Sequence, residues 1–247
     1  PPRSTLFPYT TLFRSLDRTI KNREKLGKPI DREEWGMTPQ TVNAYYSPLL
    51  NEIVFPAGIL QPPFFNMEAD DAVNYGAIGA VIGHEMGHGF DDKGSKYDGN
   101  GELRNWWTES DRKQFEERTK KLIDQYNGYT VVDGTPVNGE FTQGENIGDL
   151  AGIVIAYKAY QLSKKGSQAP IIDGLTGDQR FFFGWATIWG SKSTDEQLIR
   201  QIKTDPHSPG EFRANGPLVS MPEFVNLYNI KPGDGMYIDP NDRVKIW

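Results

Sequence analysis

The sequence lacks several features that define common classes of protein. It contains no cysteine, which excludes disulfide bonds, a cysteine-ligated zinc and a thiol nucleophile. No apolar stretch approaches the roughly 20 residues that span a bilayer, so we predict no membrane segment. The formal charge is -6 and no long run of Lys or Arg occurs, which argues against nucleic acid as a partner. Because Asn-x-Ser/Thr glycosylation sites are also missing, the composition fits a bacterial protein better than a secreted animal one.

The start of the chain differs in character from the rest. Residues 1–15 resemble the translation of a common sequencing adapter, so we interpret them as an artefact rather than as native sequence. The alternative is a genuine apolar strand with a turn at Pro8. Residues 16–247 then form one globular domain, because this length and a hydrophobic content of 37% can bury a core. Two small domains are the less favoured alternative.

Sequence patterns predict a mainly helical fold with a small β-sheet, an α+β protein. A polar helix followed by a loop is expected from residue 16 to residue 37. Capping signals at Thr194 and Ser220 predict the starts of two later helices. Further helices are expected over about residues 70–89, 108–125, 145–163 and 178–190, and a hairpin from residues 42–46 and 52–55.

Glycines share one face of the helix predicted over residues 70–89. They recur at spacings of three and four, as Gly76, Gly79, Gly83 and Gly87. Each glycine destabilises a helix by about 1 kcal/mol relative to alanine. We therefore predict a neighbouring element that approaches this face closely.

The same helix carries the motif His84-Glu85-Met86-Gly87-His88. Histidines at i and i+4 lie on one face of a helix, so both imidazoles can reach one zinc ion, with Glu85 beside it as a general base. The alternative is a pair of surface histidines. The chain has only 3 His, and two of them belong to this motif, which favours a metal site.

A catalytic zinc needs a third protein ligand, and cysteine is absent. Glu145 is the best candidate, because it begins a helix whose apolar remainder would be buried beside the motif helix. Asp149 follows at i+4 on the same face, where a carboxylate can accept the free N–H of a metal-bound imidazole. The alternative for Glu145 is a helix-start carboxylate that is favoured by the helix dipole.

The chain carries five motifs in a fixed order: Asn43-Ala-Tyr-Tyr46, the run from Glu52 to Phe65, His84-Glu-x-x-His88, Glu145-x-x-x-Asp149 and Asp205-Pro-His-Ser-Pro-Gly-Glu-Phe-Arg213. Together they resemble the catalytic domain of neprilysin-like zinc metallopeptidases. The resemblance extends from about residue 16 to residue 247. It is strongest to the bacterial, cysteine-free endopeptidase O type.

The resemblance implies a thermolysin-like zincin catalytic domain with one zinc ion per chain. His84, His88 and Glu145 would hold the zinc. Asp149 would be the carboxylate behind a metal-bound imidazole. Glu85 would take a proton from the zinc-bound water as this water attacks the peptide carbonyl, and would then deliver the proton to the leaving nitrogen.

The resemblance also implies how a peptide is bound. His207 would stabilise the oxyanion of the tetrahedral intermediate, and Arg213 would bind a substrate carbonyl beyond the scissile bond. Asn43 and Ala44 would hydrogen-bond the peptide backbone in a form of strand addition. The apolar pocket for the side chain just after the cleaved bond would consist of Ile59, Phe64, Val81, Ile188 and Trp189.

We therefore predict a zinc metalloendopeptidase that cuts short peptides on the amino side of hydrophobic residues. The alternatives are a non-catalytic peptide-binding or zinc-stabilised module and a hydrolase of non-peptide amides. Family members carry a large helical lobe N-terminal to the catalytic domain, and nothing in this sequence corresponds to it. We therefore expect a C-terminal catalytic-domain fragment of a bacterial protein, periplasmic or extracellular rather than cytoplasmic.

Overall fold

The computed structural model describes residues 6–247, which fall into two units, one ending at Gly36 and one covering Met37–Trp247. The first unit consists of helix α1, Leu6–Glu24, and the loop that follows it. This helix confirms the polar helix predicted from residue 16, and it replaces the strand considered for the residues before it. Residues 1–5 of the predicted adapter segment lie outside the described residues, and the origin of that segment stays a prediction.

The helical segment that carries the metal motif is not uniform. Asp70 caps it, because its side chain accepts a hydrogen bond from the backbone N–H of Ala72. The predicted helix over residues 70–89 is confirmed in extent, but it contains a π-helical turn that the periodicity did not indicate. Its parts are α2 (Asp71–Asn74), the π-helical turn η3 (Tyr75–Gly79), α3 (Ala80–Gly87) and the 3-10 turn η4 (His88–Phe90).

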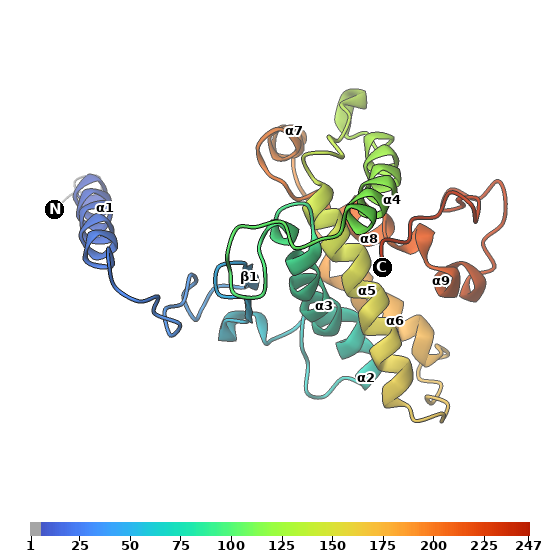
Figure 1. Ribbon diagram of the computed structural model, residues 1–247. Coiled ribbons are helices and arrows are strands. Elements are labelled where there is room, and N and C mark those ends of the chain that lie inside the picture. The colour runs from blue at the N-terminus through green and yellow to red at the C-terminus, as the bar shows by residue number, and fades with distance from the viewer. Residues whose placement is uncertain (1–5) are drawn as a thin grey trace. The chain divides into compact units, whose positions relative to one another are not determined.

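Small residues let α3 lie directly against helix α5, Gln143–Ser163 (Figure 1). A Cβ atom on Gly83 would lie 2.8 Å from the Cα atom of Gly152, and one on Gly87 would lie 3.4 Å from the Cα atom of Gly148. A side chain at Gly83 would push the two helices apart, because Cβ atoms do not approach a backbone this closely, whereas the Gly87 distance is an ordinary van der Waals contact. For Gly83 and Gly87 the predicted close neighbour is therefore α5, whose first turn comes to lie beside the motif histidines. The prediction of one neighbour for all four glycines is wrong, because Gly76 meets the backbone of Phe181 in another helix and the atoms nearest to Gly79 belong to Asn74 and Tyr75 of its own segment.

The rest of the Met37–Trp247 unit is mainly helical. Strands β1 (Tyr45–Ser47) and β2 (Glu52–Val54) pair antiparallel with Tyr45 opposite Val54, which confirms the predicted hairpin. The mainly helical fold with a small sheet is also confirmed. The other elements are η2 (Ala57–Ile59), η5 (Gly94–Lys96), α4 (Glu109–Asn127), η6 (Val132–Gly134), α6 (Gly177–Ile188), α7 (Asp195–Thr204), α8 (Gly210–Asn215), η7 (Leu218–Ser220) and α9 (Pro222–Leu227).

Helix α5 contributes to two apolar clusters, and these fix its position. In one cluster Ile153 is buried together with Trp185 of α6. In the other Ile147 is buried together with Leu122 of α4. Burying a large apolar side chain stabilises a fold by about 1.5–3 kcal/mol. The helix that begins beside Glu145 is therefore held from two sides, which keeps its first turn in one place.

The two predicted capping signals have different outcomes. Thr194 caps α7, because its hydroxyl accepts a hydrogen bond from the backbone N–H of Gln197. At Ser220 the predicted helix start is confirmed, because α9 begins at Pro222, but the predicted cap is wrong, since no side chain caps α9. The Ser220 hydroxyl instead accepts a hydrogen bond from the backbone N–H of Val244 at 2.9 Å. A short sequence pattern could not reveal this competing partner at the far end of the chain.

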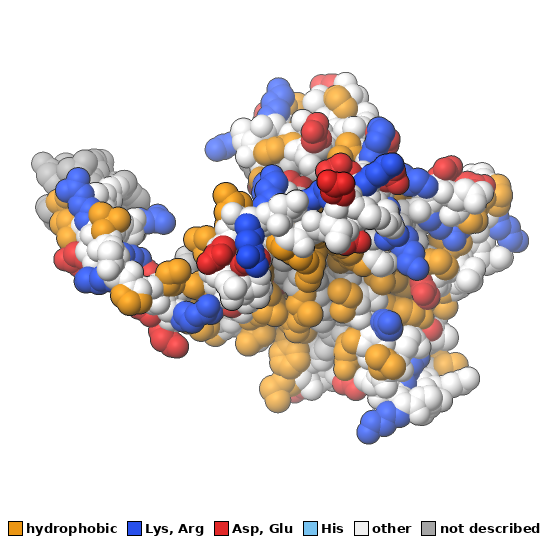
Figure 2. All heavy atoms as spheres, in the orientation of Figure 1, with side chains coloured by type: hydrophobic (Ala, Val, Ile, Leu, Met, Phe, Trp, Pro, Cys, Tyr) orange, Lys and Arg blue, Asp and Glu red, His pale blue; other side chains and the backbone are white. Residues whose placement is uncertain are grey.

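Apolar side chains also lie at the surface of the Met37–Trp247 unit, around α3 (Figure 2). On this helix Ile82 is 40% exposed and Met86 is 50% exposed. Each precedes one of the glycines that face α5, so these two side chains flank the contact between the helices. Among the described residues, no helix has the length and apolar character needed to cross a membrane.

Candidate metal centre

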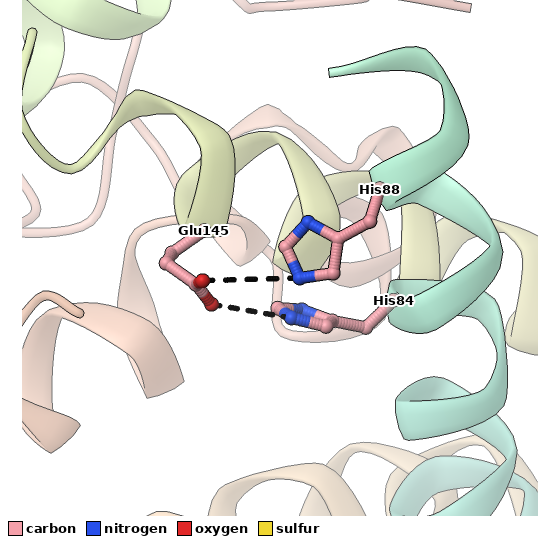
Figure 3. A group of neighbouring side chains, drawn as sticks. All are labelled: His84, His88 and Glu145. Carbon is pink, nitrogen blue, oxygen red and sulfur yellow. Dashed lines mark ion pairs between the residues drawn. The ribbon is translucent and has the colours of Figure 1, made fainter. Parts of the chain in front are cut away.

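His84, His88 and Glu145 come together where the end of α3 meets the start of α5, and their side chains point toward one another (Figure 3). His84 Nε2 lies 3.3 Å from Glu145 Oε2, and His88 Nε2 lies 3.8 Å from Glu145 Oε1. One donor atom from each residue lies within 4.8 Å of the others. Two imidazole nitrogens and one carboxylate oxygen are a donor set typical of catalytic zinc.

The Glu145 side chain is half-buried, and the surroundings of its carboxylate suit a cation. Its Oε2 atom is buried and has no hydrogen-bond partner, although His207 Nε2 lies 3.1 Å away. Burial raises the pKa of Glu145, but the imidazoles of His207 and His84 lower it by a larger amount. The net pKa lies below the ordinary value, so the carboxylate is ionised. An ionised oxygen without a hydrogen-bond donor is a natural ligand for a metal ion.

Each motif imidazole also contacts a carboxylate through its Nδ1 atom, on the side of the ring away from Glu145. His84 Nδ1 lies 2.9 Å from Asp149 Oδ1, and His88 Nδ1 lies 2.7 Å from Asp91 Oδ2. With Nδ1 engaged, Nε2 of each ring faces Glu145. Burial lowers the pKa of His84, but its contacts with Asp149 and Glu145 raise it more, to about 9. The carboxylates thus favour a positive charge at the place where a metal ion would supply one.

Asp91 is a member of this site that the sequence analysis did not identify. It is 4% exposed, and its Oδ1 accepts hydrogen bonds from the backbone N–H groups of Lys93 at 2.8 Å and Gly94 at 2.7 Å. Its Oδ2 remains for His88. The signal in the sequence is the spacing, because an acid three residues after a histidine can reach that ring across one helical turn.

We expect Asp91→Ala to weaken Zn2+ binding about tenfold to a hundredfold, because His88 loses the carboxylate that orients its ring. The affinity is measured by competition with a chelator. Asp98→Ala is the matched control, since Asp98 also accepts hydrogen bonds from two amides of its own turn but pairs with Arg104 instead of a histidine. An unchanged affinity of Asp91→Ala would contradict the role of this carboxylate.

Glu85 lies between the two histidines in the motif and is 5% exposed. It lines the same cavity as His84 and His88. Burial raises the pKa of Glu85, although both imidazoles act in the opposite direction. A carboxylate with a raised pKa accepts protons more readily than an exposed one. The site therefore has a base beside its candidate metal ligands.

Asp149 is fully buried and joins His84 to Arg213. Arg213 Nε donates to Asp149 Oδ2 and Arg213 Nη2 donates to Oδ1, both at 2.7 Å. The guanidinium also lies over Trp189, with Cζ 4.0 Å from the ring centroid. Burial raises the pKa of Asp149, but Arg213 lowers it more, so the pair is ionic. The resemblance assigns Arg213 to a substrate carbonyl, and Nη1 is the nitrogen that takes no part in the two bonds to Asp149.

His207 reaches Glu145 from the loop between α7 and α8. Its Nδ1 lies 2.6 Å from Asp205 Oδ1, and its Nε2 points to Glu145. The side chain is 42% exposed, so a substrate can reach it. The contact with Glu145 raises the pKa of His207, which favours the protonated ring. A protonated ring held at Nδ1 presents an N–H at Nε2 to the cavity.

A cavity of about 450 Å³ opens in front of these residues. Ile188, which the resemblance places in the substrate pocket, is not among the residues that line this cavity, and it lies in the core cluster that contains Trp185. Asn43 and Ala44 line the cavity directly before β1 rather than within it. The predicted substrate-binding residues that line the cavity are Asn43, Ala44, Ile59, Phe64, Val81, Trp189 and Arg213.

The site combines two histidines of the motif helix with Glu145 of α5 and the buried Glu85 beside them. This arrangement defines a protein with a His-Glu-x-x-His metal site. The chain belongs to peptidase family M13, whose family model matches residues 43–244. This match confirms the resemblance to the neprilysin-like metallopeptidases.

Two similar proteins show the extent of the relationship. Neprilysin-3 of Drosophila melanogaster is 44% identical over 230 residues, which are 92% of this chain and 29% of that protein. Endothelin-converting enzyme 1 of Homo sapiens is 45% identical over 227 residues, which are 91% of this chain and 29% of that protein. The chain therefore spans less than a third of the length of these relatives.

Solved structures of two bacterial proteins share the fold. Mycobacterium tuberculosis zinc metalloprotease Zmp1, solved in complex with an inhibitor, matches with a TM-score of 0.89 and 58% identity over 91% of this chain and 35% of its own. PepO from Lactobacillus rhamnosis HN001 matches with a TM-score of 0.80 and 39% identity over 90% of this chain and 34% of its own. The predicted zincin fold is therefore confirmed.

Proposed function

We propose that this chain carries the catalytic centre of a zinc metalloendopeptidase that hydrolyses short peptides. The observation that carries the proposal is the buried Glu145 Oε2 atom, which has no hydrogen-bond partner and lies among the imidazole nitrogens. Leaving a buried acceptor unpaired costs about 1–3 kcal/mol, and a cation between the ligands removes that cost. Zinc fits this donor set, since three protein ligands leave one coordination position open.

The chemistry follows from the groups around that position. When bound, zinc polarises a water molecule and the substrate carbonyl as a Lewis acid. Glu85 would accept the proton of the water that attacks the carbonyl carbon, and would pass this proton to the leaving nitrogen. His207, held at Nδ1 by Asp205, donates a hydrogen bond from Nε2 to the oxyanion. Asp149 keeps His84 and Arg213 in their places.

The walls of the cavity support an extended peptide as substrate. Asn43 and Ala44 precede β1 and line the cavity, where their backbone and side-chain polar groups can hydrogen-bond an extended peptide. Apolar side chains of η2 and α3, such as Ile59 and Val81, also line the cavity and favour an apolar residue just after the cleaved bond. The names of the similar proteins, neprilysin and endothelin-converting enzyme, describe peptidases and support the same substrate class.

The proposal is tested with the zinc-loaded chain and a library of quenched fluorescent peptides. We expect cleavage on the amino side of hydrophobic residues, loss of activity after treatment with a chelator, and recovery with one equivalent of Zn2+. Zinc binding without hydrolysis of any peptide would favour a non-catalytic binding module instead. Hydrolysis that survives removal of the metal would contradict the proposed centre.

We also expect the zinc affinity to depend on pH. His84 must release a proton before its Nε2 can bind the metal, and its pKa is raised to about 9. Protons therefore compete with zinc below that pH, and the apparent affinity should fall about tenfold for each unit of decreasing pH. Chelator competition at several pH values below 9 measures the slope. An affinity that does not change with pH would refute the expectation.

A further inference from the structure

A buried polar network joins helix α5 to the loop that carries His207. Ser208 Oγ donates to Asn146 Oδ1 at 2.8 Å, and Asn146 Nδ2 donates to Thr142 Oγ1 at 2.9 Å. The Thr142 hydroxyl in turn donates to the carbonyl oxygen of Asn138 at 3.0 Å. The three side chains are at most 1% exposed, so their polar atoms are satisfied within the protein.

This network connects the sequence neighbours of two functional residues. Asn146 follows Glu145, and Ser208 follows His207, so one hydrogen bond ties together the two backbone segments whose side chains meet 3.1 Å apart. Gln201 of α7 holds the loop from the other side, because its Nε2 donates to the carbonyl oxygens of His207 at 3.2 Å and Ser208 at 3.4 Å. The loop is thus fixed between α5 and α7.

We propose that Asn146 and Ser208 are positioning residues that set the place of the His207 imidazole relative to Glu145. The inference rests on the proposed function, in which His207 donates to the oxyanion. His207 has Asp205 as its other side-chain partner, and Asp205 belongs to the same loop and moves with it. The bond from Ser208 to Asn146 therefore ties the loop to the helix that supplies the metal ligand.

The deciding variant is Ser208→Ala, which removes the donor and leaves Asn146 Oδ1 buried without one. Ser220→Ala is the matched control, because it also removes a hydroxyl that is buried and hydrogen-bonded, but to the backbone of Val244 instead of the His207 loop. Equal losses of thermal stability in the two variants would show that they are comparable.

The first readout is the imidazole region of a 13C–1H spectrum, which is simple because the chain has 3 His. We expect the signals of His207 to shift or broaden in Ser208→Ala, while those of His84 and His88 keep their positions. Ser220→Ala should leave all of them unchanged. Unchanged His207 signals in Ser208→Ala, or an equal change at all the histidines, would overturn the proposal. This readout needs no turnover, so it decides the proposal even if the proposed activity fails.

The second readout separates positioning from general structure. Ser208→Ala should lower kcat about tenfold and change KM less than about twofold, because the oxyanion contact is made in the transition state. In a His207→Ala background, Ser208→Ala should have no further effect on kcat, since the two changes act on the same contact. An equal loss in both backgrounds would assign Ser208 a structural role and overturn the proposal.

Discussion

Glu85→Gln is expected to lower kcat for peptide hydrolysis by about a thousandfold, while the affinity for Zn2+ stays at the wild-type value. Glutamine has the shape of glutamate but cannot accept the proton of the attacking water. It leaves the contacts of His84 and His88 with Glu145 intact, because Glu85 is not among the groups that hold those rings. Steady-state kinetics and a chelator competition measure the two quantities separately.

The split between the two quantities makes the Glu85 experiment decisive. Met86→Leu is a suitable control, because Met86 neighbours Glu85 on the same helix but is 50% exposed and does not line the cavity. This control should keep both the activity and the zinc affinity. Equal hydrolysis by Glu85→Gln and the wild type would rule out Glu85 as the base.

Asp149→Ala is expected to have the largest effect on stability, a loss of about 3–5 kcal/mol in the free energy of unfolding. The reason is Arg213, which is 9% exposed and would lose its bidentate partner, keeping only the longer contact of Nη2 with Glu145 Oε2 at 3.7 Å. His84 would also lose the acceptor at its Nδ1. Urea unfolding of the metal-free protein measures the loss without any contribution from zinc.

A second substitution tests whether loss of the bidentate ion pair is the cause. Asp149→Ala combined with Arg213→Met should recover part of the lost stability, because no buried charge then remains without a partner. If the losses of unfolding free energy from Asp149→Ala alone and Arg213→Met alone simply add in the double variant, the ion pair is not the reason for the destabilisation.

The metal-ligand group could be predicted because its signals are local. The spacing of His84 and His88 places both rings on one helical face, and the glycines beside them predicted the close approach of a second helix. The identity of that helix was accessible because Glu145 starts an apolar segment. The roles of these residues in catalysis remain predictions that the experiments above test.

Contacts between distant segments could not be predicted. The hydrogen bonds that join Ser208 to Asn146 and Arg213 to Asp149 connect positions 62 and 64 residues apart, and neither segment contains a pattern that names its partner. Ile188 shows a second limit, because an apolar residue near the end of a helix fits a pocket wall and a core equally well. In the structure Ile188 packs in the core cluster beside Trp185, which itself also lines the cavity.

The glycine contact between α3 and α5 has a consequence for the lifetime of the folded chain. Gly83 and Gly152 let the two helices touch, and the ends of the same helices supply the ligands of one ion. A metal at a hundred times its Kd adds about 2.7 kcal/mol to the stability of whatever structure binds it. The helix pair cannot separate without releasing the ion, so backbone amides in α3 and α5 would exchange their hydrogens at a rate set by free zinc. Scarcity of zinc would therefore shorten the time that the folded chain resists proteolysis.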